Sequence, residues 1–526
     1  MGKPRLIYYN DGHHFHGKRI DPPLSLRKLY WPVDEVVGTG VETLVFGLGY
    51  GDVFFHQSTT GRTIGEGKEI WENYIDWRIM RMVRDAKEMG TDQLREVVKR
   101  GREMGMPVVT SIKLNDGHAP GAQRCGWLRW EHGKEVCVDE PPQEWAHDYT
   151  NPLVIEDKRA IIREALEDYR ADGIELDFMF SEVYFRSADI ERGALLMSEF
   201  VGGVRELANE IAAKQDREIT VMARVNHQRD ANLRMGLDVE TWLADGNLDL
   251  VVGQINGVEL VDPGDVGGRW LADAANSAGS AAYLRPAHIV YDERTIFPHI
   301  EMFRALRQSV AWQGFTGLYL GYLPWPFSRT EYEILREVAY PEITERHDKR
   351  YFLQPREGVR DESKVNASEL PDRQLPAPLA EGKTTTLSIL VADEMDSARR
   401  DGEMREPILT IRFAEFCVED EVEIRLNGTV LPLKDAEISD YHATRILAKF
   451  RSTIQAPDSF GGYWFKYKLD VDLLKQGDNT LEVEVKRFEP TAGFTRSISG
   501  VEIQTRYKDF VLPEGLNVER MAPTLY

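Results

Sequence analysis

Apolar residues follow two different spacings along this chain, and the spacing changes once, shortly before residue 384. From residue 5 to about 345, short apolar runs alternate with longer segments in which apolar residues recur with helical period. The short runs predict buried parallel strands, and the longer segments predict helices that cover them. Eight runs are expected to form strands, at residues 6–11, 42–50, 107–116, 173–178, 218–226, 248–256, 281–288 and 315–324.

Eight strand–helix units of this kind predict a (β/α)8 TIM barrel, a fold that typically takes about 250 residues and more with insertions. Several of the helical segments end in glycine immediately before the next strand, as helix C-caps commonly do. A doubly wound open sheet is the alternative arrangement of the same elements. We expect the barrel to occupy residues 1–350.

The last part of the chain alternates apolar and polar residues in steps of two, without intervening helices. The alternating segments are 384–393, 407–416, 422–432, 445–451, 463–470, 479–488 and 499–507. Short strands separated by turns predict an antiparallel β-sandwich. We expect this all-β sandwich, which resembles galactose-binding-like or jelly-roll modules, at residues 384–526. Residues 351–383 are rich in proline and charge, lack periodicity and are expected to form a linker.

One connection in the barrel half is much longer than the others. Residues 117–151, between the third and fourth expected strands, are rich in Gly, Pro, Trp and His and show no period. A loop of this length inside a compact domain is usually functional. Because it follows the carboxyl end of a strand, we expect it to cover the active site of the barrel. Trp127, Trp130 and Trp145 are candidates for stacking on sugar rings.

The fourth expected strand, "DGIELDF" at 172–178, carries two acidic residues on one side. Its apolar residues should face the helices, and Glu175 and Asp177 should then point into the barrel. Asp177 is the nearer of the two to the carboxyl end, where barrel enzymes carry their active sites. Burying two acids is costly unless cations or hydrogen bonds compensate. We therefore expect polar partners on the neighbouring strands.

Polar residues do occupy equivalent inward positions on other strands. They are Lys113 and Asn115 on the third strand, Arg224 and Asn226 on the fifth, Gln254 and Asn256 on the sixth, and Tyr283 and Arg285 on the seventh. Two interpretations follow from this arrangement. The side chains form an active site, or Glu175 and Arg224 form a buried ion pair that only stabilises the barrel.

The fourth-strand motif resembles two groups of sugar-processing barrels. The chitinase-like family carries D-G-x-D-x-D-x-E here, but Met179 stands in the position of that family's general acid. The closer resemblance is to a bacterial family-10-like group of glycosyl-hydrolase-like barrels, which carries "DGIELDFMR" on this strand. Similar segments are "SIKLND" at 111–116, "MARV" at 222–225 and "GLDVETWLADGNLDLVV" at 236–252. The resemblance implies a carbohydrate-active barrel followed by a C-terminal β-sandwich.

Glycosidic hydrolysis commonly uses two carboxyl groups placed across the scissile bond. The carboxylates at or beyond strand ends are Asp11, Asp116, Asp177 and Glu182, of which we expect Asp177 and Glu182 to be the catalytic pair. His118, in "NDGH", is a third catalytic candidate because imidazole transfers protons near neutral pH. The candidate substrate-binding residues are Asn10, His13, Tyr50, Lys113, Asn115, Glu175, Tyr184, Arg224, His227, Asn256, Arg285, Tyr322 and Trp325.

Three functions are compatible with these residues. The first is a glycoside hydrolase that cleaves an oligosaccharide with paired carboxylates. The second is a lyase or dehydratase acting on uronic-acid sugars, in which His or Tyr abstracts a proton and Arg or Lys neutralises the enolate. The third is a non-catalytic glycan-binding protein whose barrel has lost one acid.

Composition narrows the choice of partners and compartment. The net charge of −22 argues against nucleic acid and against an anionic membrane surface. Three cysteines give no disulfide framework or zinc signature, and we expect no metal or cofactor. No signal core or membrane-length apolar run is present, so we expect a cytoplasmic protein, or a periplasmic one if a signal peptide was removed. A homo-oligomer is compatible with the sequence.

Overall fold

Eight parallel strands form a closed barrel in the computed structural model, which describes residues 2–13, 15–119, 125–141, 143–255, 261–286, 290, 297–354, 374–439 and 462–508. Going round the barrel, the order is β1-β11-β10-β9-β8-β7-β6-β2. The strands are β1 (Leu6–Asn10), β2 (Thr43–Gly47), β6 (Val108–Lys113), β7 (Gly173–Asp177), β8 (Thr220–Asn226), β9 (Leu250–Gln254), β10 (Ala281–Arg285) and β11 (Gly317–Gly321). The predicted TIM barrel is confirmed, and the open-sheet alternative is wrong because β1 pairs with both β2 and the last barrel strand, β11.

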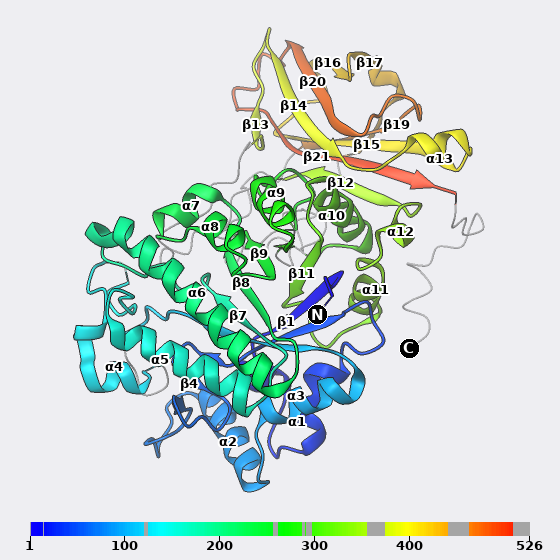
Figure 1. Ribbon diagram of the computed structural model, residues 1–526. Helices are drawn as coiled ribbons and strands as arrows, with labels where there is room; N and C mark the ends of the chain where they lie inside the picture. Colours follow the sequence, from blue (N-terminus) through cyan, green and yellow to red (C-terminus); the bar gives the residue numbers. More distant parts are fainter. Residues whose placement is uncertain are drawn as a thin grey trace.

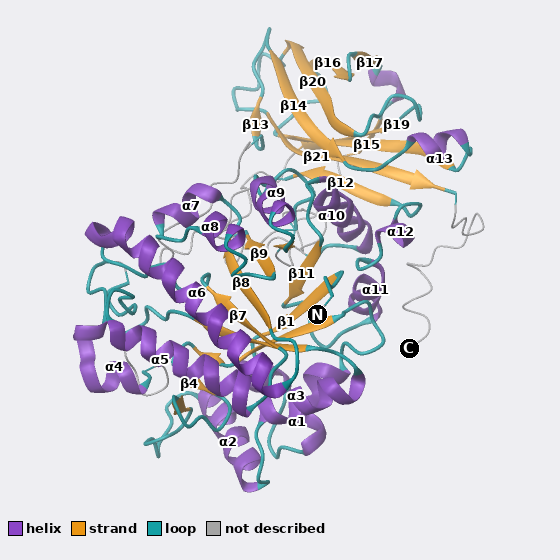
Figure 2. Ribbon diagram, viewed as in Figure 1, coloured by secondary structure: helices purple, strands orange, loops and turns teal. Residues whose placement is uncertain are grey.

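Helices surround the barrel and alternate with its strands along the chain (Figures 1 and 2). They are α1 (Leu26–Asp34), α2 (Tyr74–Glu88), α3 (Gln93–Met104), α4 (Trp127–His132), α5 (Pro152–Arg163), α6 (Ile190–Gln215), α7 (Arg229–Arg234), α8 (Val239–Ala244), α9 (Arg269–Ser277), α10 (Ile300–Trp312), α11 (Arg329–Glu337) and α12 (Pro341–Thr344). Local capping explains their ends. The Asp92 side chain accepts the Arg95 N–H at the start of α3, and Gly105 ends that helix with a positive φ of 68°.

Two separate apolar cores follow from the alternation of side chains along each strand. The larger core lies between the strands and the helices and contains Ile174, Leu176 and Phe178. The smaller core fills the barrel interior with Ile7, Tyr9, Val45, Val109, Met222, Leu250, Val252, Ala281, Tyr283 and Tyr319. The apolar face of β7 therefore packs against helices as predicted, which leaves Glu175 and Asp177 for the interior.

A small antiparallel and parallel sheet interrupts the connection after β2. It consists of β3 (Gly49–Tyr50), β4 (Val53–Phe54) and β5 (Arg62–Thr63). The strand expected at 42–50 is thus divided, with β2 ending at Gly47 and β3 pairing with β4 instead of continuing the barrel. A side chain at Gly49 would meet the Val53 carbonyl oxygen at 2.1 Å, so glycine permits this close approach of β3 and β4.

The C-terminal strands form two antiparallel sheets that pack as a sandwich beside α9, α10 and α12 (Figure 1). One sheet contains β12 (Lys349–Leu353), β21 (Ser497–Tyr507), β15 (Met404–Ala414), β19 (Gly462–Lys468) and β18 (Glu437–Ser439), with β13 (Ala377–Pro378) paired to β21. The other contains β14 (Thr384–Val391), β20 (Gly477–Arg487), β16 (Glu421–Leu426) and β17 (Thr429–Leu431). The short helix α13 (Asp396–Arg400) follows β14.

Strand pairing extends into the segment that was expected to be a linker. The segment expected to be a linker, 351–383, includes the end of β12 and all of β13, because both strands pair with β21. The expected strand 445–451 lies outside the described residues. In the described parts of the chain, no helix combines the length and apolar character needed to cross a membrane.

Candidate active site

Three charged residues lie side by side at the carboxyl ends of β6, β7 and β8. The strand register pairs Asp177 with Lys113 on one side and with Arg224 on the other. The Asp177 carboxylate accepts a hydrogen bond from Arg224 Nη2 at 2.6 Å and from the Met179 N–H at 2.8 Å. Asp177 therefore occupies the predicted position, inside the barrel and at its carboxyl end, with two donors directed at it.

Glu175 lies deeper in the barrel and shares the same guanidinium. Its carboxylate accepts from Ser111 Oγ at 2.7 Å and Tyr319 OH at 3.1 Å, and Arg224 Nη2 lies 3.3 Å away. Burial raises the pKa of Glu175, and the Arg224 charge only partly opposes this effect. Glu175 thus has the contacts of a buried ion pair, as the second sequence interpretation proposed.

Arg224 is held on every side by the barrel interior. Its guanidinium carbon lies 4.5 Å from the ring centre of Tyr9 and 5.6 Å from that of Tyr319. Burial alone would lower the pKa of Arg224, but the charges of Asp177 and Glu175 raise it well above its ordinary value. The side chain is a cation held between two carboxylates.

His118 and Asp116 form a second polar pair just beyond the end of β6. The His118 Nδ1 atom lies 2.5 Å from Asp116 Oδ1, and the His118 backbone N–H donates to the same oxygen at 3.0 Å. The Asp116 side chain is fully buried, whereas the His118 side chain is 54% exposed. A carboxylate that anchors one imidazole nitrogen orients the ring for proton transfer, which is the arrangement found in catalytic triads.

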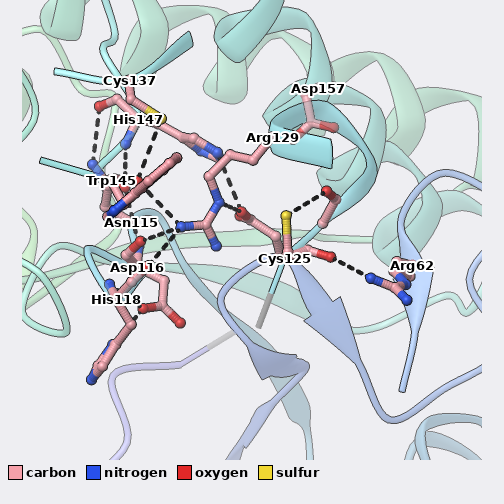
Figure 3. A network of polar contacts seen from close by, with 12 residues as sticks. Arg62, Asn115, Asp116, His118, Cys125, Arg129, Cys137, Trp145, His147 and Asp157 are labelled. Atoms are coloured by element: carbon pink, nitrogen blue, oxygen red, sulfur yellow. Dashed lines mark hydrogen bonds and ion pairs between the residues drawn. The ribbon is translucent and has the colours of Figure 1, made fainter. Parts of the chain in front are cut away.

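Arg129, from α4 in the long loop, holds the backbone on which this pair is built (Figure 3). Its Nη1 donates to the carbonyl oxygens of Asp116 at 2.8 Å, Trp145 at 3.2 Å and His118 at 3.3 Å. No sequence pattern predicted a role for Arg129. The nearest signal was its position in a tryptophan-rich segment of the long loop.

A buried carboxylate, Asp52, fixes Arg129 in turn. Asp52 lies 2.7 Å from Lys158 Nζ, 3.0 Å from Arg129 Nε and 3.2 Å from His147 Nε2. Burial disfavours its charged form, yet the His147, Lys158 and Arg129 groups together hold the pKa of Asp52 well below its usual value. Burial favours the neutral form of His147 and so lowers its pKa. An ionic cluster therefore anchors the long loop to two other segments of the barrel half, the turn between β3 and β4 and helix α5.

Asn115 and Tyr184, two expected substrate-binding residues, contact the protein backbone instead. The Asn115 amide donates to the carbonyl oxygens of Val183 at 2.6 Å and His147 at 3.1 Å, and its oxygen accepts the His147 N–H at 2.7 Å. The Tyr184 hydroxyl donates to the Phe178 carbonyl at 2.7 Å within the outer core. Both residues hold loops together, and the structure assigns neither of them to the barrel interior.

Glu182, the second expected acid, is buried in the loop after β7. Its neighbour Ser181 accepts the Gly117 N–H at 2.9 Å, which ties this loop to the start of the long loop. Burial raises the pKa of Tyr184 most, and the nearby Tyr149, Asp177 and Glu182 groups raise it further. The charges of both expected catalytic carboxylates therefore influence the Tyr184 phenol.

Five further expected site residues lie at or just beyond the ends of β1, β3, β10 and β11. Asn10 Oδ1 accepts the Gly12 N–H at 3.0 Å, and the His13 ring lies 4.4 Å from the Tyr50 ring. The Tyr322 hydroxyl donates to Asp11 at 3.1 Å, and the Arg285 guanidinium lies 5.4 Å from the Tyr322 ring. These contacts bring Tyr322 and Arg285 together at the carboxyl end of the barrel.

His227 and Trp325 contact other groups of the barrel half, and Asn256 is not described. His227 Nδ1 lies 3.2 Å from the Gln254 carbonyl oxygen, and Trp325 packs on Arg19 at 5.5 Å. Asn256 lies outside the described residues. Within the described ranges, no group of three or more His, Cys, Asp or Glu side chains is arranged to hold a metal ion.

Comparisons with known proteins give only distant structural likenesses. No family model matches the chain, and no curated protein matches it. The glycoside hydrolase domain of PgaB (BpsB) from Bordetella bronchiseptica is similar at 14% identity and a TM-score of 0.41, covering 64% of this chain and 99% of that one. The endo-1,4-β-D-mannanase of Thermotoga petrophila is similar at 12% identity and a TM-score of 0.39, with the same coverage.

A third likeness extends into the sandwich. The cycloisomaltooligosaccharide glucanotransferase of Paenibacillus sp. is similar at 10% identity and a TM-score of 0.33, and 95% of this chain aligns with it. The chain spans 57% of the length of that protein. Membership of the family-10-like group stays a prediction, and the fold assignment rests on the strand pairing of the chain itself.

Proposed function

We propose that the protein is a carbohydrate-active enzyme that cleaves glycosidic bonds of an oligosaccharide at the carboxyl end of the barrel. The observation that carries this proposal is the position of Asp177, at the end of β7 and next in register to Lys113 and Arg224. The oriented Asp116–His118 pair follows the adjacent strand β6. Barrel enzymes build their active sites at this end, from residues of several different strands.

The roles follow from the surroundings of each group. Asp177 accepts hydrogen bonds from Arg224 and from a backbone N–H, so it is suited to act as an anion, as a nucleophile or in stabilising positive charge on the sugar. Glu182 serves as the partner acid in this proposal. His118, exposed and anchored on Asp116, transfers a proton to or from the substrate.

Elimination from a uronic-acid sugar is the second candidate function, and the Asp116–His118 pair favours it. An oriented imidazole is a suitable base for the proton next to a sugar carboxylate. Arg224 and Tyr184 were expected to assist, but Arg224 is engaged by Asp177 and Glu175, and Tyr184 donates to Phe178. Elimination would therefore depend on His118 and Lys113.

A substrate screen distinguishes these functions. Wild-type protein, Asp177→Asn and His118→Ala are incubated with a panel of neutral and uronic-acid oligosaccharides, and new reducing ends and unsaturated products are measured together. Reducing ends without unsaturation indicate hydrolysis, and both signals together indicate elimination. Binding without any turnover would support a glycan-binding protein instead.

The two variants test the assignment of residues. We expect His118→Ala to lower turnover by about 10³-fold, within the range for loss of a general acid or base, and Asp177→Asn to lower it at least as much. Asp177→Asn leaves Arg224 with one fewer charge partner, so its folding is checked by thermal unfolding. His118→Ala removes an exposed ring and serves as the second, structurally milder variant. Wild-type turnover in both variants, on a confirmed substrate, would refute this site.

A further inference from the structure

Two tryptophans expose much of their side chains on the long loop. Trp127 is 37% exposed and Trp130 is 61% exposed, and both belong to α4. Residues three apart on a helix lie on the same face, with Cβ atoms about 5–6 Å apart. Tryptophan is highly buried on average, so two neighbouring exposed indoles require an explanation.

A buried arginine fixes both rings. The Arg62 guanidinium carbon lies 5.2 Å from the ring centre of Trp130 and 5.4 Å from that of Trp127. Arg62 itself is 4% exposed and donates to the carbonyl oxygens of Glu66 at 2.6 Å and Cys125 at 3.0 Å, the latter contact being visible in Figure 3. The indoles are therefore stacked on an immobile cation, which holds their exposed surfaces in place.

The same helical turn connects these rings with the proposed active site. Arg62 belongs to β5, in the connection after β2, and α4 lies in the connection after β6. β2 and β6 are neighbours in the barrel. Arg129, between the two tryptophans in sequence, is buried and donates to the backbone of Asp116 and His118. One side of α4 thus supports the catalytic pair, and the other exposes the indoles.

We propose that Trp127 and Trp130 form a glycan-binding subsite for the part of a polysaccharide chain that extends beyond the barrel. The proposal rests on the proposed function, because the ligand is a longer form of the same substrate. Aromatic faces pack against the apolar faces of pyranose rings, and the two indoles share one face of α4. Because the contact is between apolar faces, a neutral glycan can bind the two indoles without opposite charges on protein and ligand.

The size of the patch argues against a protein partner. An aromatic side chain buries about 150–250 Å² when fully covered. Two of them fall well below the roughly 800 Å² per partner of a stable protein interface. The next residue, Glu131, is exposed and charged, which interrupts the apolar surface. A narrow chain of sugar rings fits a patch of this extent.

Affinity gel electrophoresis tests the subsite without requiring turnover. His118→Ala protein and its Trp127→Ala/Trp130→Ala derivative migrate through gels containing xylan, mannan, β-glucan, α-glucan or a polyuronate. We expect at least one polymer to retard the parent and the derivative to bind it about tenfold more weakly. The loss should grow with chain length in a series of oligosaccharides. Trp312→Ala, at the end of α10 and 42% exposed, is the matched control and should bind as the parent does.

Several outcomes would overturn the subsite. The proposal is wrong if parent and derivative are retarded equally, or if no polymer retards the parent. It is also wrong if affinity for short and long oligosaccharides falls equally, or if removal of the indoles changes the molecular mass of the protein. The last would indicate contact between two copies of the chain. Failure of the proposed function is separate: polymer binding that depends on the indoles, without turnover by wild-type protein, supports the subsite and refutes the catalytic assignment.

Discussion

Two buried aspartates, Asp52 in the barrel half and Asp393 beside the sandwich, are surrounded by different kinds of partners. Asp52 is surrounded by nitrogen groups, those of Lys158, Arg129 and His147. Asp393 contacts one cation, Lys349 Nζ at 3.1 Å, and three hydroxyl groups. The hydroxyl donors are Thr505 Oγ1 at 2.6 Å, Tyr507 OH at 2.9 Å and Tyr351 OH at 3.0 Å.

The two clusters join different kinds of segments. The Asp52 cluster connects the turn between β3 and β4 with α4, the end of the long loop and α5, where few ladder hydrogen bonds are available. The Asp393 cluster joins β12 to β21, two strands already paired along their length. Lys349 also donates to the carbonyl oxygens of Glu345 and His347, just before β12, and so links the barrel to the sandwich.

The Asp52 cluster therefore determines the path of a loop, whereas the Asp393 cluster adds stability to strands that are already paired. Loops lack the repeated backbone bonds of a sheet, so a few side chains set their path. The path of the long loop determines where Asp116 and His118 lie. We therefore expect a change at Asp52 to affect turnover and stability together, and a change at Asp393 to affect stability alone.

The largest effect is expected for Asp52→Asn. The substitution leaves Arg129 and Lys158 buried with one fewer negative charge, which should cost about 3–5 kcal/mol of unfolding free energy. It should also lower kcat/KM by about 10²-fold, because a catalytic group displaced by about 1 Å loses roughly that factor. Steady-state kinetics and denaturant unfolding measure the two effects. A destabilised Asp52→Asn protein with full turnover would show that the cluster does not position His118.

Asp393→Asn makes the same change of charge at the other cluster and completes the comparison. Lys349 loses its carboxylate partner, and burial already lowers the pKa of this lysine. We expect a comparable loss of about 3–5 kcal/mol in unfolding free energy. The folded variant should keep wild-type kcat/KM. Glu240→Gln, at the exposed Arg229–Glu240 pair, should change neither quantity. A loss of turnover in Asp393→Asn would make the two clusters equivalent.

Residue periodicity predicted most of the fold, because each period reports a repeated geometry. The eight barrel strands and the inward placement of Glu175 and Asp177 follow from alternation along buried strands. The small sheet β3–β5 was not predicted, since two-residue strands are too short to show any period. The pairing of β12 with β21 was missed because these strands are far apart in sequence.

The candidate site was predictable only as far as the strands extend. Asn115 lies beyond the end of β6 at Lys113, so alternation no longer fixes the direction of its side chain, and it binds loop backbone. Tyr184 lies in the loop after β7, where alternation also fixes no direction, and its hydroxyl donates to the Phe178 carbonyl oxygen. Asp52 stands in a short turn, and its partners are distributed over distant positions of the chain. Only the tertiary structure brings such a cluster together.

The two clusters should also differ in acid, because only the Asp52 cluster contains a histidine. Burial lowers the pKa of His147 below the value of about 6.5 expected in the unfolded chain. The unfolded chain therefore takes up this proton first, and the stability contributed by neutral His147 is lost as the pH falls below about 6.5 and through the folded-state pKa. The charges facing the ring are Asp52, which favours protonation, and Lys158 and Arg129, which oppose it.

Unfolding measured between pH 7 and pH 5 tests this difference. His147→Gln should become more stable relative to wild type as the pH falls, by about 1.4 kcal/mol for each unit of pKa depression. His16, whose pKa burial lowers to about 4, contributes in the same direction in both proteins and cancels in the difference. A constant offset for His147→Gln would contradict a neutral, buried His147.

The smallest effect is expected for Thr505→Val, which removes one of the four donors around Asp393 and keeps the shape of the side chain. Because Lys349, Tyr351 and Tyr507 still contact the carboxylate, only one hydrogen bond to a charged group is lost, worth about 1.5–3 kcal/mol. Denaturant unfolding should therefore give a smaller loss than for Asp393→Asn. If Thr505→Val cost as much as Asp393→Asn, the hydroxyl donors would act as one inseparable unit, and the contrast with the ionic cluster at Asp52 would disappear.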